Sequence, residues 1–197
     1  PHSARAISAR AEASGTAPRL FGIWRSQIGR PRDELNVITT WHGDPEFARH
    51  DAVWLETLPV RSIQTRGMRP TLRPLAPTPP ERQGNYAFRF FETPEEHWEA
   101  FLELCVEAWP GFESAYDSQV IGLWRLDPER DDSPRAGIES LLMTRRPDLA
   151  MWERSKLPQS EEERRVREKL SRRYDLCDAT VVYTSTLLTA RDHEDTA

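Results

Sequence analysis

Hydrophobic and polar residues alternate along several short stretches of the chain, and each stretch is rich in β-branched or aromatic residues. Alternation with a period of two is typical of a strand with one buried face. The strands that this pattern predicts cover residues 20–28, 35–42, 60–68, 86–91, 118–126, 137–145 and 180–189. Most of the sequence between them is polar or rich in proline.

The most clearly marked helix follows the strand at 86–91. Thr93 is suited to be its N-cap, Pro94 its first residue, and Glu96 the acid that closes a capping box. Apolar residues then recur at helical spacing, which predicts one buried stripe. The stripe consists of Trp98, Phe101, Leu102, Cys105 and Trp109. Pro110 and Gly111 predict the end of the helix.

Two further helical segments are predicted. One covers Pro45–Leu58, with Asp44 as its N-cap. The other covers residues 148–176 and is interrupted near Pro158. Ser160 is suited to cap its second part, since three glutamates follow in the first turn.

A short motif occurs twice. Phe21–Arg25 reads FGIWR and Ile121–Arg125 reads IGLWR, with a spacing of 100 residues between Gly22 and Gly122. Each copy precedes a polar turn, a β-rich run and a helix that starts at a proline. Three landmarks in one order predict a duplication, against the alternative that a single short motif recurs by chance.

These elements predict an α+β fold made of tandem ferredoxin-like (βαββαβ) repeats. Residues 1–69 would form a first repeat that is incomplete at its N-terminus, and residues 85–190 a complete second one. The proline-rich stretch 70–84 would be an extended linker, and residues 191–197 a flexible tail. Residues 4–14 are a candidate remnant of the first repeat's missing helix.

Composition excludes several functions. The net charge is −5 and the pI is about 5.6, so nucleic acid and anionic membrane surfaces are not expected partners. No apolar run is long enough to span a bilayer. The two cysteines lack metal-type spacing and are expected to be reduced thiols of a cytosolic protein. Residues 1–18 are compatible with a mitochondrial transit peptide or a flexible arm.

Several segments together resemble the NIPSNAP family. They are Gly22-Ile23-Trp24, Asn36-Val37-Ile38, Tyr86-Ala87-Phe88-Arg89, Ala108-Trp109-Pro110 and Gly122-Leu123-Trp124-Arg125. The resemblance implies a dimeric α/β-barrel, in which two ferredoxin-like sheets face each other across a dimer or between tandem copies. NIPSNAP proteins are linked to vesicle handling and mitochondrial association, which implies a cytoplasmic protein in a bacterium or a mitochondrial one in a eukaryote. Structural relatives include cofactor-free and haem-degrading monooxygenases.

No strong catalytic motif is present, and the histidines are the candidates for acid–base chemistry. His42 ends a predicted strand, and His97 lies beside Trp98 at the start of a predicted helix. A metal site would need His42, Asp44 and His50 to converge, and surface or capping roles explain them better. We therefore expect no metal and no cofactor.

The aromatic residues predict either a packed core or a ligand cavity. Trp24 and Trp124 each share a strand face with a glycine two residues earlier, which leaves a recess beside the indole. Core packing alone explains this arrangement. The rival interpretation is a cavity between sheet and helix for a small apolar ligand. Its lining would consist of Trp24, Trp124, Tyr86, Phe88, Phe90, Trp98 and Trp109. Arg89 would point to the opposite face and pair with an acid.

Two functional hypotheses follow. The first is a small-ligand or protein-interaction module without catalysis, favoured by the surplus of aromatic residues and the lack of a reactive motif. The second is a pocket enzyme of the dimeric α/β-barrel group, monooxygenase-like or haem-degrading, with His42 or His97 as base. Under either hypothesis we expect a homo-oligomer, because half a barrel exposes an apolar sheet face.

Overall fold

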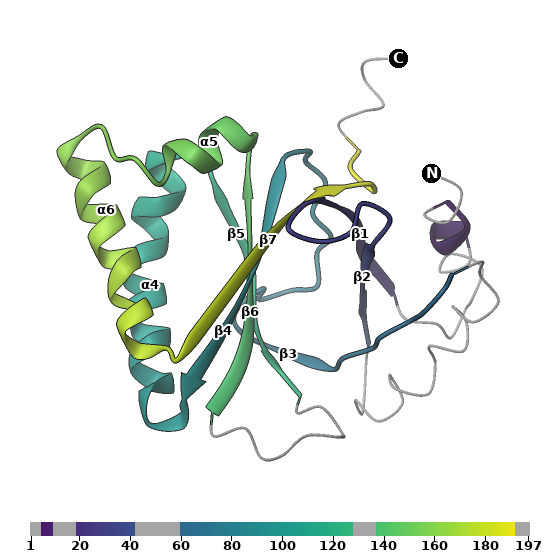
Figure 1. Ribbon diagram of the computed structural model, residues 1–197, viewed down its shortest axis with the longest axis horizontal. Coiled ribbons are helices and arrows are strands. Elements are labelled where there is room, and N and C mark those ends of the chain that lie inside the picture. Colours follow the sequence, from purple (N-terminus) through teal and green to yellow (C-terminus); the bar gives the residue numbers. More distant parts are fainter. Residues whose placement is uncertain (1–4, 10–18, 42–59, 128–136, 192–197) are drawn as a thin grey trace.

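The computed structural model describes residues 5–9, 19–41, 60–127 and 137–191 (Figure 1). Within these ranges one antiparallel sheet has seven strands in the order β2-β1-β7-β4-β6-β5-β3. The strands are β1 Arg19–Ile28, β2 Leu35–Thr40, β3 Met68–Arg73, β4 Asn85–Pro94, β5 Gln119–Leu126, β6 Gly137–Arg146 and β7 Ala179–Leu187. The helices are α4 Trp98–Ala115, α5 Leu149–Arg154 and α6 Glu161–Arg172, with the short 3-10 helices η1 Glu95–His97 and η2 Tyr174–Leu176. Figure 1 shows α4, α5 and α6 on one side of the curled sheet.

The second half of the chain has the predicted order of elements. From β4 to β7 the elements run β-α-β-β-α-β, with α5 and α6 together in the place of the second helix. Their four strands lie side by side in the order β7-β4-β6-β5. The central strand β4 pairs along its whole length with β6, from Asn85 opposite Arg146 to Pro94 opposite Gly137.

The strands of the first half join the same sheet. β1 and β2 form an antiparallel hairpin, and Gly29 in its turn has φ 97°, a conformation that favours glycine. β1 also pairs with β7, while β3 pairs with β5. The predicted helix 45–58, with its cap Asp44, lies outside the described residues, as does most of the segment 4–14. Residues 5–9 form a helical turn in which Ile7 is buried.

The predicted strand at 60–68 is wrong. Residues 60–67 form no strand, and the sheet pairing begins at Met68 and includes Pro70. Val60 and Ile63 are exposed, so their apolar pattern does not mark a buried face. Proline is tolerated in β3 because this strand ends the sheet and needs ladder donors on one side only. β3 therefore reaches into the predicted linker.

Both ends predicted for the long helix are also wrong. Thr93 and Pro94 still belong to β4, where they pair with Ile138 and Gly137, so Thr93 is not an N-cap. α4 starts at Trp98 and continues through Pro110 to Ala115. Continuation past the proline places Phe112 in the core, which offsets the lost backbone hydrogen bond. The predicted cap of the later helix is confirmed, because Ser160 Oγ accepts from the Glu163 N–H at 3.1 Å.

The sheet separates two hydrophobic cores. The helix-side core packs α4 and α6 against the sheet, and it includes the predicted stripe members Trp98, Phe101, Cys105 and Trp109. The inner core lies on the opposite face and is built around Trp24, Tyr86, Phe88 and Trp124.

Each repeated tryptophan folds over its glycine, as the alternation predicted. A Cβ added to Gly22 would lie 2.5 Å from the Trp24 indole, and one added to Gly122 would lie 2.4 Å from that of Trp124. Both cysteines are free thiols, as expected. No helix in the described ranges is long and apolar enough to cross a membrane.

Candidate functional site

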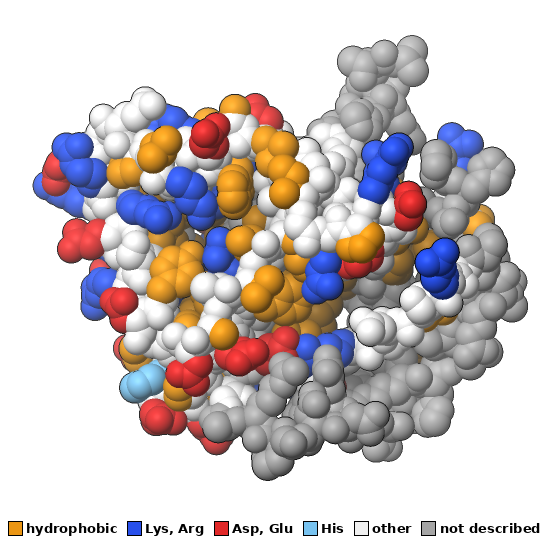
Figure 2. Space-filling view, in the orientation of Figure 1, with side chains coloured by type: hydrophobic (Ala, Val, Ile, Leu, Met, Phe, Trp, Pro, Cys, Tyr) orange, Lys and Arg blue, Asp and Glu red, His pale blue; other side chains and the backbone are white. Residues whose placement is uncertain are grey.

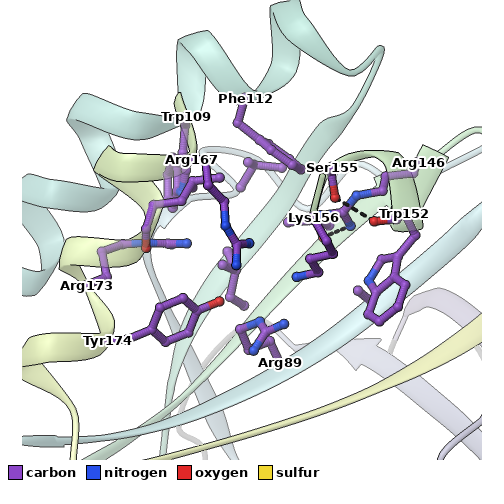
Figure 3. Close-up of a pocket in the computed structure, with 15 residues that line it drawn as sticks. Arg89, Trp109, Phe112, Arg146, Trp152, Ser155, Lys156, Arg167, Arg173 and Tyr174 are labelled. Carbon is purple, nitrogen blue, oxygen red and sulfur yellow. Dashed lines mark hydrogen bonds between the residues drawn. The ribbon is translucent and has the colours of Figure 1, made fainter. Parts of the chain in front are cut away.

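A cleft lies between the helices and the sheet (Figure 3). Its volume is about 40 Å³, and its wall comes from every element of the second half except β7 and η1. The sheet contributes Ala87, Arg89, Val120, Leu142, Thr144 and Arg146; the helices and the loops beside them contribute Trp109, Phe112, Trp152, Ser155, Lys156, Arg167, Leu170, Arg173 and Tyr174.

Five of the lining side chains are cationic and none is acidic. We call them the cationic cluster: Arg89, Arg146, Lys156, Arg167 and Arg173. Figure 3 shows the Lys156 amine, the Arg167 guanidinium and the Tyr174 hydroxyl directed into the same space, with Arg89 across from them. Figure 2 shows lysine and arginine side chains gathered among hydrophobic ones over the helical part of the molecule.

Neutral groups hold the arginines in place. The Arg146 guanidinium donates to Thr144 Oγ1 at 3.1 Å and lies over the Phe112 ring at 4.8 Å. Arg173 donates to the Leu170 carbonyl at 3.3 Å and to Cys105 Sγ at 3.5 Å. Such contacts fix a guanidinium without neutralising it.

Arg89 also lacks the acidic partner that the sequence predicted. It donates to Thr180 Oγ1 at 3.3 Å and lies over the Tyr174 ring at 5.5 Å. Within the part of the chain that the structure describes, no member of the cationic cluster forms an ion pair. The positive charge of the cleft is therefore uncompensated there.

The uncompensated charge changes the protonation of the cluster. Burial, and next the positive charges of Arg89 and the other arginines, lower the pKa of Lys156 to about 7. Burial and the charge of Arg89 lower the pKa of Arg146 to about 10. Burial likewise lowers the pKa of Arg89. Each shift means that the cleft disfavours positive charge and would be stabilised by an anion.

Buried donors without partners lie in the same wall. The indole Nε1 atoms of Trp109 and Trp152 and the Nε atom of Arg146 form no hydrogen bond among the described residues. Arg146 is 7% exposed and Trp109 is 3% exposed. A buried donor without an acceptor costs about 1–3 kcal/mol. An anion offers only acceptors, so it complements both the charges and these donors.

The loop that carries Lys156 is fixed by Glu163. Both carboxylate oxygens of Glu163 accept from the Arg154 guanidinium, and one also accepts from the Gln159 N–H at 2.6 Å. The hydrogen bond from Arg154, and next that from the Gln159 backbone, lower the pKa of Glu163 to about 2. This pair joins the end of α5 to the start of α6, on the two sides of Lys156.

Most of the site residues that the sequence predicted lie outside this cleft. His97 is exposed in η1 and does not line it, and His42 lies outside the described residues. Trp24, Trp124, Tyr86 and Phe88 come together, but in the inner core on the other face of the sheet. Trp98 belongs to the helix-side core, whereas Trp109, also predicted to line a cavity, lies in the wall of the cleft. Ligand binding by this set stays a prediction.

Sequence reasoning missed the cationic cluster. Its members were part of an evenly mixed pattern of acids and arginines that reads as a solvated surface. One available signal was Lys156, because the chain has only two lysines and this one follows a tryptophan-containing helical turn. Another was Arg146, which shares a strand face with Leu142. Among the described residues, no three His, Cys, Asp or Glu side chains converge as metal ligands.

Comparisons with known proteins support the fold. No protein-family model matches the chain. No curated protein matches it either. A solved structure described as an anthrone oxidase-like protein aligns with a TM-score of 0.54 and 11% identity, over 93% of this chain and 83% of that one. A provisionally named monooxygenase from Lactobacillus acidophilus NCFM aligns at 0.48 and 10% identity, over 96% and 88%.

The first likeness covers nearly the whole chain and shows the fold alone. A curled antiparallel sheet with helices on one side is consistent with the dimeric α/β-barrel fold. None of these findings identifies a NIPSNAP protein, so that family membership stays a prediction.

Proposed function

We propose that this chain, whose curled antiparallel sheet is consistent with the dimeric α/β-barrel fold, binds a small aromatic anion in the cleft between its helices and its sheet. The observation that carries the proposal is the cationic cluster, which holds four arginines and one lysine with no acid among the lining residues. The sequence predicted a small apolar ligand, and the cluster adds a negative charge to that description. Binding of this kind is the first of the two hypotheses drawn from the sequence.

Electrostatics favours an anion in this cleft. Burial, and next repulsion by the neighbouring arginines, lowers the pKa of Lys156. The chain as a whole carries a net charge of −5, so the cluster is a local concentration of positive charge. An anion would remove the repulsion and gain charge-assisted hydrogen bonds.

The rest of the wall favours an aromatic ring. Phe112, Val120, Leu142 and Leu170 supply apolar surface, and the indoles of Trp109 and Trp152 supply both apolar surface and donors. Small-molecule sites commonly combine an apolar lining with a few polar groups. The volume of about 40 Å³ is smaller than the roughly 150 Å³ of a cavity that encloses a benzene ring. The cleft would therefore hold the anionic group and one edge of a single-ring carboxylate or aryl phosphate, with the rest of the ring outside it.

Calorimetric titration with benzoate tests this proposal. We expect benzoate to bind and the neutral analogue benzamide to bind at least about tenfold more weakly, because it lacks charge-assisted hydrogen bonds. Phenyl phosphate and inorganic phosphate are included as further arms. Binding of both phosphates would assign the site to phosphate, whereas binding of phenyl phosphate alone would show that the ring is needed.

Two arginines of α6 provide a matched pair of variants. Arg167 lines the cleft, whereas Arg165 is 73% exposed and pairs with Glu161 on the surface. Arg167→Gln should weaken benzoate binding by about tenfold or more, and Arg165→Gln should leave it unchanged. Equal loss in both variants, or equal affinity for benzoate and benzamide, would contradict binding in the cleft.

A second candidate function is oxygenation of a phenolic substrate. The fold is shared with an anthrone oxidase-like protein, and the lowered pKa of Lys156 suits a base that removes a phenolic proton. The arginines would then hold the phenolate. Oxygen uptake with aromatic hydroquinones, and the haemin spectrum, test the oxygenase and haem-degrading versions. No uptake and no spectral change would leave binding without catalysis.

We also propose that β1, β2 and β3 are strands two, three and four of a first ferredoxin-like unit. Two hairpins support this, because β1–β2 and β5–β6 carry a register shift at Leu20/Gly22 and at Val120/Gly122, again 100 residues apart. Cross-pairing supports it too, since β1 joins β7 and β3 joins β5. In this arrangement strand two of each unit pairs with strand four of the other.

A further inference from the structure

We infer that Lys156 is a nucleophilic amine that forms an imine with the carbonyl group of a small anionic aldehyde or ketone held in the cleft. The inference rests on the proposed binding of an anion there and adds a covalent step to it. It names the chemical class of ligand as a carboxylate or phosphate that also carries a carbonyl group.

The position of Lys156 suits this role. The residue follows α5 and lies among the lining residues, with its Nζ 5.1 Å from the centre of the Trp152 ring. Figure 3 shows its amine directed into the space that the Arg167 guanidinium also faces. The side chain is partly exposed, so a ligand can reach it.

Every charged group that faces Lys156 across the cleft is positive. Arg89 lies on β4, Arg146 on β6, Arg167 on α6, and Arg173 just after α6, while α4 contributes only Trp109 and Phe112. The neighbouring η2 adds the Tyr174 hydroxyl. A lysine next to other cations in a desolvated place is a recognised form of activated nucleophile.

These surroundings make the amine available at neutral pH. With a pKa of about 7, about half of Lys156 is uncharged at pH 7. An ordinary lysine with a pKa of about 10.4 is uncharged in roughly one molecule in 2500 at this pH. The nucleophilic form is therefore enriched by about a thousandfold.

The step balances without any further reactant. The nitrogen lone pair of Lys156 attacks the carbonyl carbon and forms a C–N bond, while the carbonyl π electrons move to oxygen. The amine loses its two protons and the oxygen leaves with them as water, so that amine and carbonyl become imine and water. The arginines hold the ligand's anionic group and stabilise negative charge that develops on the carbonyl oxygen.

The second lysine of the chain is a natural control. Lys169 also lies on the helical side, but it is 44% exposed and its Nζ pairs with Glu107 at 3.2 Å. Its amine is held by an acid on the helical surface and does not line the cleft. The chain has no other lysine, so an adduct can be assigned to one of two side chains or to the α-amino group.

Reductive trapping with 4-formylbenzoate tests the inference. The intact chain is mixed with this aldehyde at pH 7, borohydride delivers hydride to the imine carbon, and peptide mass spectrometry locates the resulting secondary amine. We expect labelling of Lys156 to exceed that of Lys169 by at least about a hundredfold, because only Lys156 lines the cleft in which the aldehyde would be held beside the amine. Lys156→Arg should abolish the adduct and Lys169→Arg should leave it in place.

Two further arms link labelling to the cleft. Benzaldehyde lacks the anionic group, so it should label Lys156 at least about tenfold more slowly than 4-formylbenzoate does. Benzoate should protect Lys156 from labelling. Equal labelling of Lys169, faster labelling of the α-amino group, or no effect of benzoate would each overturn the inference.

The experiment separates this inference from the proposed function. If benzoate binds with dependence on Arg167 but 4-formylbenzoate leaves no adduct on Lys156, the imine step is wrong and anion binding stands. If benzoate does not bind and no adduct forms, both are wrong.

Discussion

At the scale of single residues, the surroundings of Lys156 determine its chemistry. Burial and four arginines act in the same direction on one amine, and none of these effects is local in the sequence. The positions that contribute most, residues 89 and 146, come from β4 and β6, which are adjacent in the sheet. The other lysine of the chain, Lys169 on α6, forms an ion pair with an acid, Glu107.

The lowered pKa of Lys156 implies that stability depends on pH. Its pKa is about 7 in the folded state, against about 10.4 when unfolded, so the unfolded chain binds more protons between these values. Lys156 therefore lowers the free energy of unfolding, and this contribution has its full size below pH 7. The contribution disappears as pH rises towards about 10.4. We expect Lys156→Met to raise the free energy of unfolding at pH 6.5 and to raise it much less at pH 10.

Chemical denaturation at the two pH values measures this difference. Lys169→Met is the control, since its partner is an acid and its removal should not stabilise the fold. A stabilisation by Lys156→Met that is the same at pH 6.5 and pH 10 would contradict the shifted protonation.

The paired glycines offer a second test at this scale. Gly22→Ala and Gly122→Ala would each place a methyl group against a buried indole, at 2.5 Å and 2.4 Å before any adjustment. Overpacking of this kind costs about 1–3 kcal/mol. We expect both variants to lose stability to a similar degree in urea denaturation, and Gln119→Ala, exposed on β5, to lose little. A neutral effect at both glycines would contradict the tight contact.

Residue patterns predicted part of this picture. The glycine and tryptophan pairing could be predicted because alternation fixes which side chains share a strand face. The face of β4 on which Arg89 lies was also predicted, since its side chain points away from the face that carries Tyr86 and Phe88. Its neighbours could not be, because they come from η2 and β7, far away in the sequence.

At the scale of elements, the corner between α5 and α6 positions the reactive side of the cleft. Asp148 caps α5 by accepting from the Met151 N–H at 2.7 Å, and Ser160 caps α6. Glu163 then ties the two helices together through Arg154. The sequence indicated the break near Pro158 and the cap at Ser160, because capping signals are local.

Removal of the Glu163 charge should loosen this corner. The pKa of Glu163 is lowered from 4.5 to about 2 by its hydrogen bonds, so its carboxylate stabilises the fold above pH 4.5. This contribution is lost as pH falls from 4.5 through 2. Glu163→Gln should therefore be less stable than the native chain at pH 7, with a gap that narrows in acid.

Thermal unfolding from pH 7 down to pH 2.5 measures that gap. Glu161→Gln, at the start of the same helix, removes an acid that is 63% exposed and pairs with Arg164 and Arg165 on the surface. It should have little effect at any of these pH values. A gap for Glu163→Gln that is constant across the range would contradict the role of its charge.

Element boundaries failed in the sequence prediction where pairing between distant strands decides them. β4 extends to Pro94 because β6 pairs with it that far, and no local signal shows this. β3 contains a proline that argues against a central strand, and its place at the edge of the sheet removes the objection.

At the scale of the whole molecule, the fold brings the cluster together from one continuous half of the chain. Arg89 and Arg146 come from paired strands, whereas Lys156 and Arg167 come from the helical segment that covers them. The sequence could therefore predict the α+β fold from its repeated patterns but not this cleft. Candidate histidines were favoured because their chemistry is recognisable at any position, whereas an arginine becomes notable only when its partners are known.

The ends of the sheet lead to an expectation about assembly. β2 and β3 end the described sheet, and each pairs with a neighbour on one side only. Exposed strand edges favour association with another chain. We expect light scattering to give a mass that is a multiple of 22.8 kDa at micromolar concentration. A mass of 22.8 kDa itself would contradict a homo-oligomer.

Binding of an anion by the cationic cluster is tested most directly by a crystal structure of the protein soaked with 4-bromobenzoate. Anomalous scattering from bromine locates the ligand without any assumption about the site. We expect the bromine signal between the helices and the sheet, with the carboxylate within hydrogen-bond distance of Arg146, Lys156 or Arg167. A carboxylate that contacts none of the cationic cluster, or a bromine signal beside Trp24 and Trp124 on the other face of the sheet, would contradict it.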